Sequence, residues 1–160
     1  MKKLALTLCL LFSMCFSFAA ELNSAQERLR NDIMNYIRRE GFVPEIDNDG
    51  DIRFKKEGTT YFVRVDAKET NPMYVVFFCL YNKPSNYSVD AVRLATAELN
   101  QYKGVKTVVY DTGTISVESN MFMNDAEPFR AGFYRILQLF GYVEEDILDE
   151  CRAAAPRVRD

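Results

Sequence analysis

The chain has 160 residues, with 20 basic and 23 acidic side chains, a formal net charge of −3, and no histidine. This length indicates a single domain that is large enough to bury a core. The lack of histidine excludes histidine-based acid–base catalysis, the usual Ser/His and Cys/His nucleophile pairs, and most zinc sites. The acidic balance, without a basic cluster, argues against nucleic acid as a partner.

Residues 1–19 have the pattern of a signal peptide. A basic start precedes the apolar residues 4–18, and small side chains favour cleavage after Ala19, or else after Ala20. Without the two lysines of this segment, 18 basic residues remain against 23 acidic ones, a net charge of −5. No later stretch reaches the roughly 18 apolar residues of a membrane span. We therefore expect an exported protein, periplasmic or secreted, with no membrane span in the mature chain.

A first helix of about four turns is predicted from Ser24. Ser24 and Glu27 have the spacing of a capping box, and Gly41 followed by Pro44 ends the helix. The apolar period then changes to two, which is typical of strands. Turn signals separate the strand segments that begin at residue 43, at residue 51 and at residue 60.

Residues 73–81 (MYVVFFCLY) form the stretch around which we expect the domain to be organised. All nine side chains are apolar or aromatic, and the run is too short to be a membrane-spanning helix. Its length and its valines and phenylalanines indicate a strand that is apolar on both faces. We therefore place this strand near the centre of a sheet.

The rest of the chain alternates between helix and hairpin patterns. We expect a helix over 88–102, strands over 105–111 and 114–119, and a third helix from Asp125 that breaks at Gly141 before a short acidic helix. Residues 153–160 are expected to form a flexible tail. The prediction is one α+β domain over residues 24–152, with a single antiparallel sheet and helices mainly on one face. Its element order is α-β-β-β-(β)-α-β-β-α.

The segment after the first helix resembles the opening motif of the YbjN-like family of sensory transduction regulators. The matching residues are Gly41-Phe42, Pro44, Ile46-Asp47, Asp49-Gly50-Asp51-Ile52, Phe54, Glu57-Gly58 and Tyr61. The resemblance implies the fold of type III secretion chaperones, frequent dimers, no established catalytic residues and no cofactor. Chaperones of this fold bind extended segments of client proteins. They act in the cytosol, and the export signal of this chain departs from that pattern.

Three other motifs have a functional and a structural interpretation. Cys79 and Cys151 either pair as a disulfide, which an oxidising compartment permits, or stay as buried thiols. Residues 45–52 match part of a calcium loop, but Lys56 replaces its closing glutamate, so a hairpin turn is the preferred interpretation. The acidic residues 144–146 are interpreted as the stabilised start of a helix rather than as an acid–base pair. We predict no catalytic, metal or cofactor site.

The central strand carries the positive functional signal. The neighbouring strands alternate between apolar and polar residues, so one of their faces can be exposed to solvent. Residues 73–81, in contrast, are apolar on both faces. With helices on one face, the other face presents an apolar strip rimmed by cations, a feature that marks partner contacts. The candidate partner-binding residues are Tyr74, Val76, Phe78, Leu80, Arg53 and Arg64.

The predicted function is therefore non-enzymatic protein binding, by dimerisation or by capture of an extended segment of another chain. The alternative is a small-molecule or lipid-binding module with an apolar pocket between sheet and helices.

Overall fold

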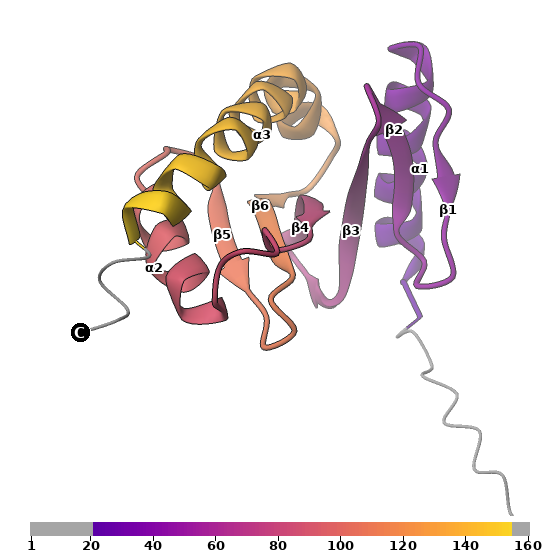
Figure 1. Ribbon diagram of the computed structural model, residues 1–160. Coiled ribbons are helices and arrows are strands. Elements are labelled where there is room, and N and C mark those ends of the chain that lie inside the picture. Colours follow the sequence, from indigo (N-terminus) through magenta and orange to yellow (C-terminus); the bar gives the residue numbers. More distant parts are fainter. Residues whose placement is uncertain (1–20, 155–160) are drawn as a thin grey trace, which may run out of the picture.

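The computed structural model describes residues 21–154, so the predicted signal peptide and residues 155–160 of the predicted tail lie outside the described part. The elements are α1 (Ser24–Arg39), β1 (Glu45–Ile46), β2 (Ile52–Lys56), β3 (Thr59–Thr70), β4 (Met73–Tyr81), α2 (Val89–Leu99), β5 (Lys106–Val109), β6 (Ile115–Met123) and α3 (Glu127–Ala154) (Figure 1). Within these residues, no helix is both long enough and apolar enough to cross a membrane.

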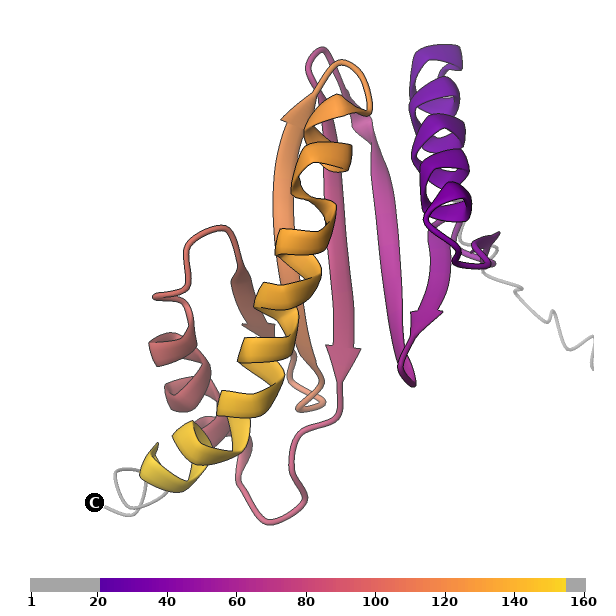
Figure 2. The ribbon, with the colours of Figure 1, turned by 90° about the horizontal axis from the view of Figure 1, so that it is seen from above.

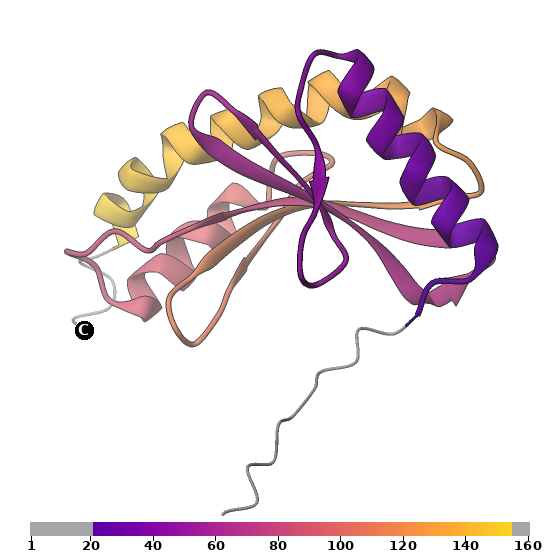
Figure 3. The ribbon, with the colours of Figure 1, turned by 90° about the vertical axis from the view of Figure 1, so that its right-hand side faces the viewer.

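The strands form one six-stranded sheet in the order β1-β2-β3-β4-β6-β5, and every neighbouring pair is antiparallel. Helix α3 runs along one face of this sheet, with α1 beside β2 and β3 and α2 beside β5 (Figures 2 and 3). The buried side chains of all three helices belong to the same core as the inward side chains of the strands. The predicted fold class, with its single antiparallel sheet and its helices on one side, is confirmed.

The core between sheet and helices is built from aromatic rings. Phe77 of β4 is fully buried and lies parallel to Phe133 of α3 with 5.8 Å between ring centroids. Phe140 of the same helix meets Phe77 edge-on at 5.2 Å. Such pairs add to the hydrophobic stabilisation that comes from burying each ring. This packing fixes the inward face of β4.

The N-cap of helix α1 lies one residue earlier than expected. Asn23 is the N-cap, and the reciprocal partner in its capping box is Gln26, so the predicted box of Ser24 and Glu27 is wrong. Gln26 is fully buried, and its side-chain amide donates to the carbonyl oxygens of Asp66 at 2.9 Å and Glu69 at 3.1 Å. These bonds occupy backbone acceptors in the part of β3 that extends past β2.

Helix α3 is continuous from Glu127 to Ala154, so the predicted break at Gly141 is wrong. Glycine costs about 1 kcal/mol inside a helix, but the buried stripe continues on both sides of it, with Phe140 before and Val143 after. The acidic residues 144–146 therefore lie inside a helix and not at a helix start, which corrects their predicted placement. The helix also includes Ala153 and Ala154, which we had expected in the tail.

The carboxylates of this acidic stretch accept hydrogen bonds from tyrosines of neighbouring elements. Tyr81 donates its hydroxyl proton to Glu144 at 3.1 Å, and Tyr102 donates to Asp146. Burial is the largest cause of the raised pKa of Tyr81, which keeps this phenol protonated as a donor. These contacts tie α3 to the end of β4 and to the segment after α2.

Residues 47–51 form a hairpin turn. The backbone N–H of Asp47 donates to the carbonyl of Asp51 at 2.9 Å, and the Asp47 carboxylate accepts from the N–H groups of Asp49 and Asp51, both at 3.0 Å. An aspartate at the start of a turn commonly bonds its own backbone in this way. The flanking strands β1 and β2 pair across the turn. The hairpin interpretation of this segment is confirmed.

Cys79 and Cys151 are both free thiols, and both are buried. Burial raises the pKa of Cys79 to about 12, so its reactive thiolate form is scarce at neutral pH. The sequence left open whether these cysteines form a disulfide or stay as buried thiols. The structure has two buried thiols.

A thiol titration of residues 21–160 at pH 8 tests this arrangement. We expect Cys79 and Cys151 to react slowly or not at all in the native protein, because both side chains are shielded from the reagent. In 6 M guanidinium without reductant, a concentration that we choose to unfold the chain, both should react at once. A chain that still gave no reactive thiol after unfolding would contradict the free-thiol structure and support a disulfide.

Candidate functional site

The side chains of β4 alternate between two environments. Val75, Phe77 and Cys79 point inward and are fully buried among the helices and neighbouring strands. Tyr74, Val76, Phe78 and Leu80 point to the opposite side. Among residues 21–154, none of the helices crosses that side, since all three pack on the inward face (Figures 2 and 3). We call the outward side chains of β2 to β6 the open sheet face.

The middle of the open sheet face is apolar but largely shielded. Phe78 is only 8% exposed although none of the described helices lies over it. The ring of Phe62 from β3 stacks on Phe78 with 5.1 Å between centroids, and the Arg64 guanidinium lies 5.2 Å from the centroid of the Phe78 ring. A cation over an aromatic face at this distance is attractive. Side chains of the neighbouring strand β3 therefore shield the centre of the apolar strip of β4 from solvent.

The two ends of the strip are the exposed parts. At one end, Phe122 of β6 is 63% exposed and its ring centroid lies 4.9 Å from that of Tyr74. At the other end, Leu80 is 44% exposed, and Tyr110, which directly follows β5, is also exposed. The exposed apolar groups of the open sheet face therefore lie at its two ends, and the buried ring of Phe78 separates them.

The rim cations are held by carboxylates. Arg53 of β2 donates from Nε and Nη2 to the Glu45 carboxylate of β1, at 3.1 and 2.6 Å. Arg64 donates from Nε to Asp51 Oδ1 at 3.1 Å and from Nη2 to Oδ2 at 2.7 Å, which is the two-pronged geometry that guanidinium favours. Both arginines remain about half exposed.

Asp51 is the buried member of the second pair, at 4% exposure. Burial raises the pKa of Asp51 from its ordinary value, and the hydrogen bonds from Arg64 oppose that effect. The same hydrogen bonds raise the pKa of Arg64. Arg64 is therefore the charge that allows a carboxylate to stay ionised at this depth, and it covers Phe78 at the same time.

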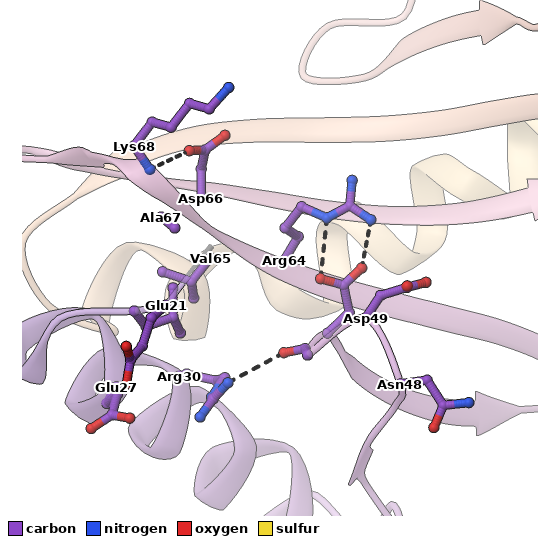
Figure 4. A pocket seen from close by; sticks show the side chains of 13 residues that line it. Glu21, Glu27, Arg30, Asn48, Asp49, Arg64, Val65, Asp66, Ala67 and Lys68 are labelled. Carbon is purple, nitrogen blue, oxygen red and sulfur yellow. Dashed lines mark hydrogen bonds and ion pairs between the residues drawn. The ribbon is translucent and has the colours of Figure 1, made fainter. Parts of the chain in front are cut away.

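A cleft of about 670 Å³ lies at the rim of the sheet, between the start of α1, the turn before β2 and the later part of β3 (Figure 4). Its lining includes the Asp51–Arg64 pair and Arg30, whose Nη1 donates to the carbonyl of Gly50 at 3.4 Å. Among these lining side chains, Arg64 and Asp51 form the ion pair that Figure 4 shows. A second cleft of about 310 Å³ lies beside β2.

The space between sheet and helices is filled by side chains. The rings of Phe54, Phe77, Phe129 and Phe133 contact one another there, with centroids 5.5 to 6.0 Å apart. The two clefts described above lie at the rim, outside this layer. This packing does not favour the alternative of an apolar ligand pocket between sheet and helices.

All six candidate residues predicted from the sequence project from the outward side of their strands. Tyr74, Val76, Phe78 and Leu80 come from β4, Arg53 from β2, and Arg64 from β3 opposite Val76. The prediction missed Phe62, Phe122 and Asp51. Phe62 was detectable, because it lies between the apolar residues Tyr61 and Val63 in an alternating strand and so points to the opposite face from them. Phe122 was missed because we ended that strand at residue 119, whereas β6 continues to Met123.

Comparison with known proteins identifies a fold and no family. No family model matches the chain, and no curated protein matches its sequence. One chain of a solved structure, described as "Structure of the HopA1-SchA Chaperone-Effector Complex", superimposes with a TM-score of 0.56 at 8% sequence identity. The match covers 78% of this chain and 99% of that one. The type III secretion chaperone-like fold that the motif implied is thereby confirmed.

Proposed function

We propose that this chain is an exported, non-enzymatic protein-binding domain. Its binding surface is the open sheet face, and the bound chain is either a second copy of the domain or an extended segment of another protein. The observation that carries this proposal is the apolar strip of β4, which no helix of the described residues covers and which is flanked by two exposed side chains, Leu80 of β4 and Phe122 of β6. The fold likeness to a chaperone–effector structure is consistent with it.

The energetics of the strip favour a partner. Burial of an apolar side chain is worth about 1.5–3 kcal/mol, and the exposed Leu80, Phe122 and Tyr110 have not gained it. Binding hot spots typically combine aromatic and arginine side chains, and Arg64 lies over Phe78 at the middle of this strip. Export and membership in the YbjN-like family belong to the same proposal. They rest on residues 1–19 and on the motif between Gly41 and Tyr61.

Sedimentation velocity of residues 21–160, from low to high micromolar concentration, tests the second-copy form of the proposal. We expect a concentration-dependent increase in mass that disappears in the double variant Leu80→Asp, Phe122→Asp, because charges would then have to be buried in the contact. The control is Leu94→Asp with Leu148→Asp, which alters similarly exposed leucines on α2 and α3. A strictly monomeric wild-type protein rejects dimerisation and leaves the extended segment.

A further inference from the structure

The second half of β6 has an open outer edge. Strand β5 pairs with β6 only from Ile115 to Glu118, whereas β4 pairs with it from Ile115 to Met123. On the side of β6 that faces away from β4, no described strand lies beside residues 119–123 (Figure 2). This edge continues the line of β5, so a strand added there would extend the sheet.

The backbone of this edge has hydrogen-bonding groups that face outward. In the β5–β6 hairpin, the N–H of Tyr110 donates to the carbonyl of Thr114 at 2.9 Å, so Thr114 and every second residue after it face the β5 side. The register along β6 is regular, which places the N–H and C=O groups of Asn120 and Phe122 on the outer edge. Outward backbone groups without a strand partner are a template for another strand.

The other edges of the sheet are covered or charged, which is how natural sheets avoid unwanted pairing. Strand β2 is covered by β1 at its start and ends with two lysines. The part of β3 that extends past β2 donates its carbonyls to Gln26 as acceptors and has charged side chains within residues 66–69. At the outer edge of β5, the N–H of Thr107 donates to the Asn100 side chain at 2.6 Å. Residues 119–123 (SNMFM), in contrast, contain neither a charge nor a proline.

Phe122 sets the side-chain preference of this edge. Its ring lies on the open sheet face, contacts Tyr74 of β4 and is 63% exposed. The residue of an added strand that pairs with Phe122 would have its side chain on the same face, about 5 Å away. An apolar side chain at that position would cover the ring. The edge therefore favours an extended segment with an apolar residue opposite Phe122 and no proline at its bonding positions.

A second copy of this chain fits this edge poorly. Symmetric pairing of two β6 edges centred on Met121 would bring residue 124 of the second copy to the place beside β6 that Lys106 fills. Symmetric pairing centred on Phe122 avoids Lys106, but then only residues 121–123 of the two strands lie opposite each other. An unrelated segment has no such restriction and can pair with the whole edge.

We propose that the outer edge of β6, from Ser119 to Met123, binds an extended segment of another protein as an added β-strand, with an apolar side chain of that segment over Phe122. This inference rests on the proposed function and names how the segment is held. Backbone hydrogen bonds to Asn120 and Phe122 provide the attachment, and the exposed ring of Phe122 provides the side-chain contact.

The test uses fluorescent seven-residue peptides and anisotropy with residues 21–160. The probe has Val at positions 3 and 5 and Thr or Ser elsewhere, because β-branched residues favour strands. One matched peptide is N-methylated at positions 3 and 5, whose amides would face β6, and another at positions 4 and 6, whose amides would face solvent. We expect the first methylation to weaken binding about tenfold or more and the second to change it little, because only the first removes hydrogen bonds.

Proline substitutions in the protein test the same edge from the other side. Asn120→Pro removes one outward N–H and leaves the pairing of β6 with β4 in place, so it should weaken binding of the unmethylated probe about tenfold. Lys55→Pro is the matched control, because the N–H of Lys55 faces outward at the opposite edge of the sheet, beyond β1. It should leave binding unchanged. If Asn120→Pro does not fold, the two methylated peptides decide the question on the wild-type protein.

Equal binding of the two methylated peptides would overturn the inference and leave the proposed function standing, since the contact would then depend on side chains alone. Absence of probe binding up to about 1 mM, the affinity of a very weak complex, would also overturn the inference. The proposed function has a separate test in sedimentation, so the two failures are distinguishable.

Discussion

Replacing Phe77 by alanine is expected to lower the free energy of unfolding by about 4 kcal/mol. Phe77 is fully buried at the centre of β4, and its ring contacts Phe133 and Phe140 of α3. The substitution removes a large apolar surface and leaves a cavity that the surrounding rings cannot fill without leaving their rotamers. Since domains of this size are stable by about 5–15 kcal/mol, this one change removes a large part of the total.

Urea denaturation at 25 °C measures this effect, with Phe122→Ala as the matched control. Phe122 is the same residue type on the other side of the sheet and is 63% exposed, so its loss should cost less than about 1 kcal/mol. If the alanine variant fails to fold, Phe77→Leu keeps the test available, with an expected loss of about 1–2 kcal/mol. Equal losses for Phe77→Ala and Phe122→Ala would contradict the inward and outward assignment of the sheet.

Replacing Arg64 by methionine is expected to lower the free energy of unfolding by roughly 2–3 kcal/mol at pH 7. Methionine retains an unbranched stem, so the loss reports mainly on the guanidinium. Asp51 would then keep a buried charge without its partner. The expected cost is below that of a fully buried pair, because half of the Arg64 side chain is exposed to solvent.

This loss should depend on pH. Burial raises the pKa of Asp51 above its ordinary value of 3.8 even with Arg64 present. A carboxyl group with a raised pKa in the folded state favours folding most below the unfolded value, and that contribution is lost as pH rises through the folded value. Without Arg64 the pKa of Asp51 rises further, so the deficit of Arg64→Met should be small near pH 3.8 and grow toward pH 7.

Unfolding in urea at several pH values checks the trend. The control is the double variant Asp51→Asn, Arg64→Met, in which the extra pH dependence should disappear because no carboxyl remains to titrate. A deficit that stayed constant from pH 4 to pH 7 would show that Arg64 acts through packing on Phe78 and not through the Asp51 charge.

The sequence predicted the elements of this fold better than their interactions. The unbroken apolar run of residues 73–81 identified the central strand, because the length and composition of a run are local features of the chain. The continuity of α3 was missed because Gly141 was expected to end a helix, as Gly41 does after α1. There, burial of Phe140 and Val143 outweighs the glycine penalty, and that burial comes from tertiary packing.

The candidate site was predicted in composition but not in arrangement. Alternation along one strand places Tyr74, Val76, Phe78 and Leu80 on the same face, but the sequence left open which face the helices cover. The shielding of Phe78 by Phe62 and Arg64 depends on the register between β3 and β4, and register is set by turns and by packing of the whole sheet. The strand order, in which β6 pairs with β4 and places β5 at the edge, also was not predicted from the sequence.

Site-specific photo-crosslinking in cells that produce the protein tests the central claim most directly. A photoreactive phenylalanine analogue placed at Phe122 or Leu80 samples the open sheet face, and the same group at Tyr134 samples an exposed site on α3. The proposal predicts crosslinked protein products, with the same chain or with another, from Phe122 and Leu80 and not from Tyr134. Equal products from all three positions, or products from Tyr134 alone, would contradict it.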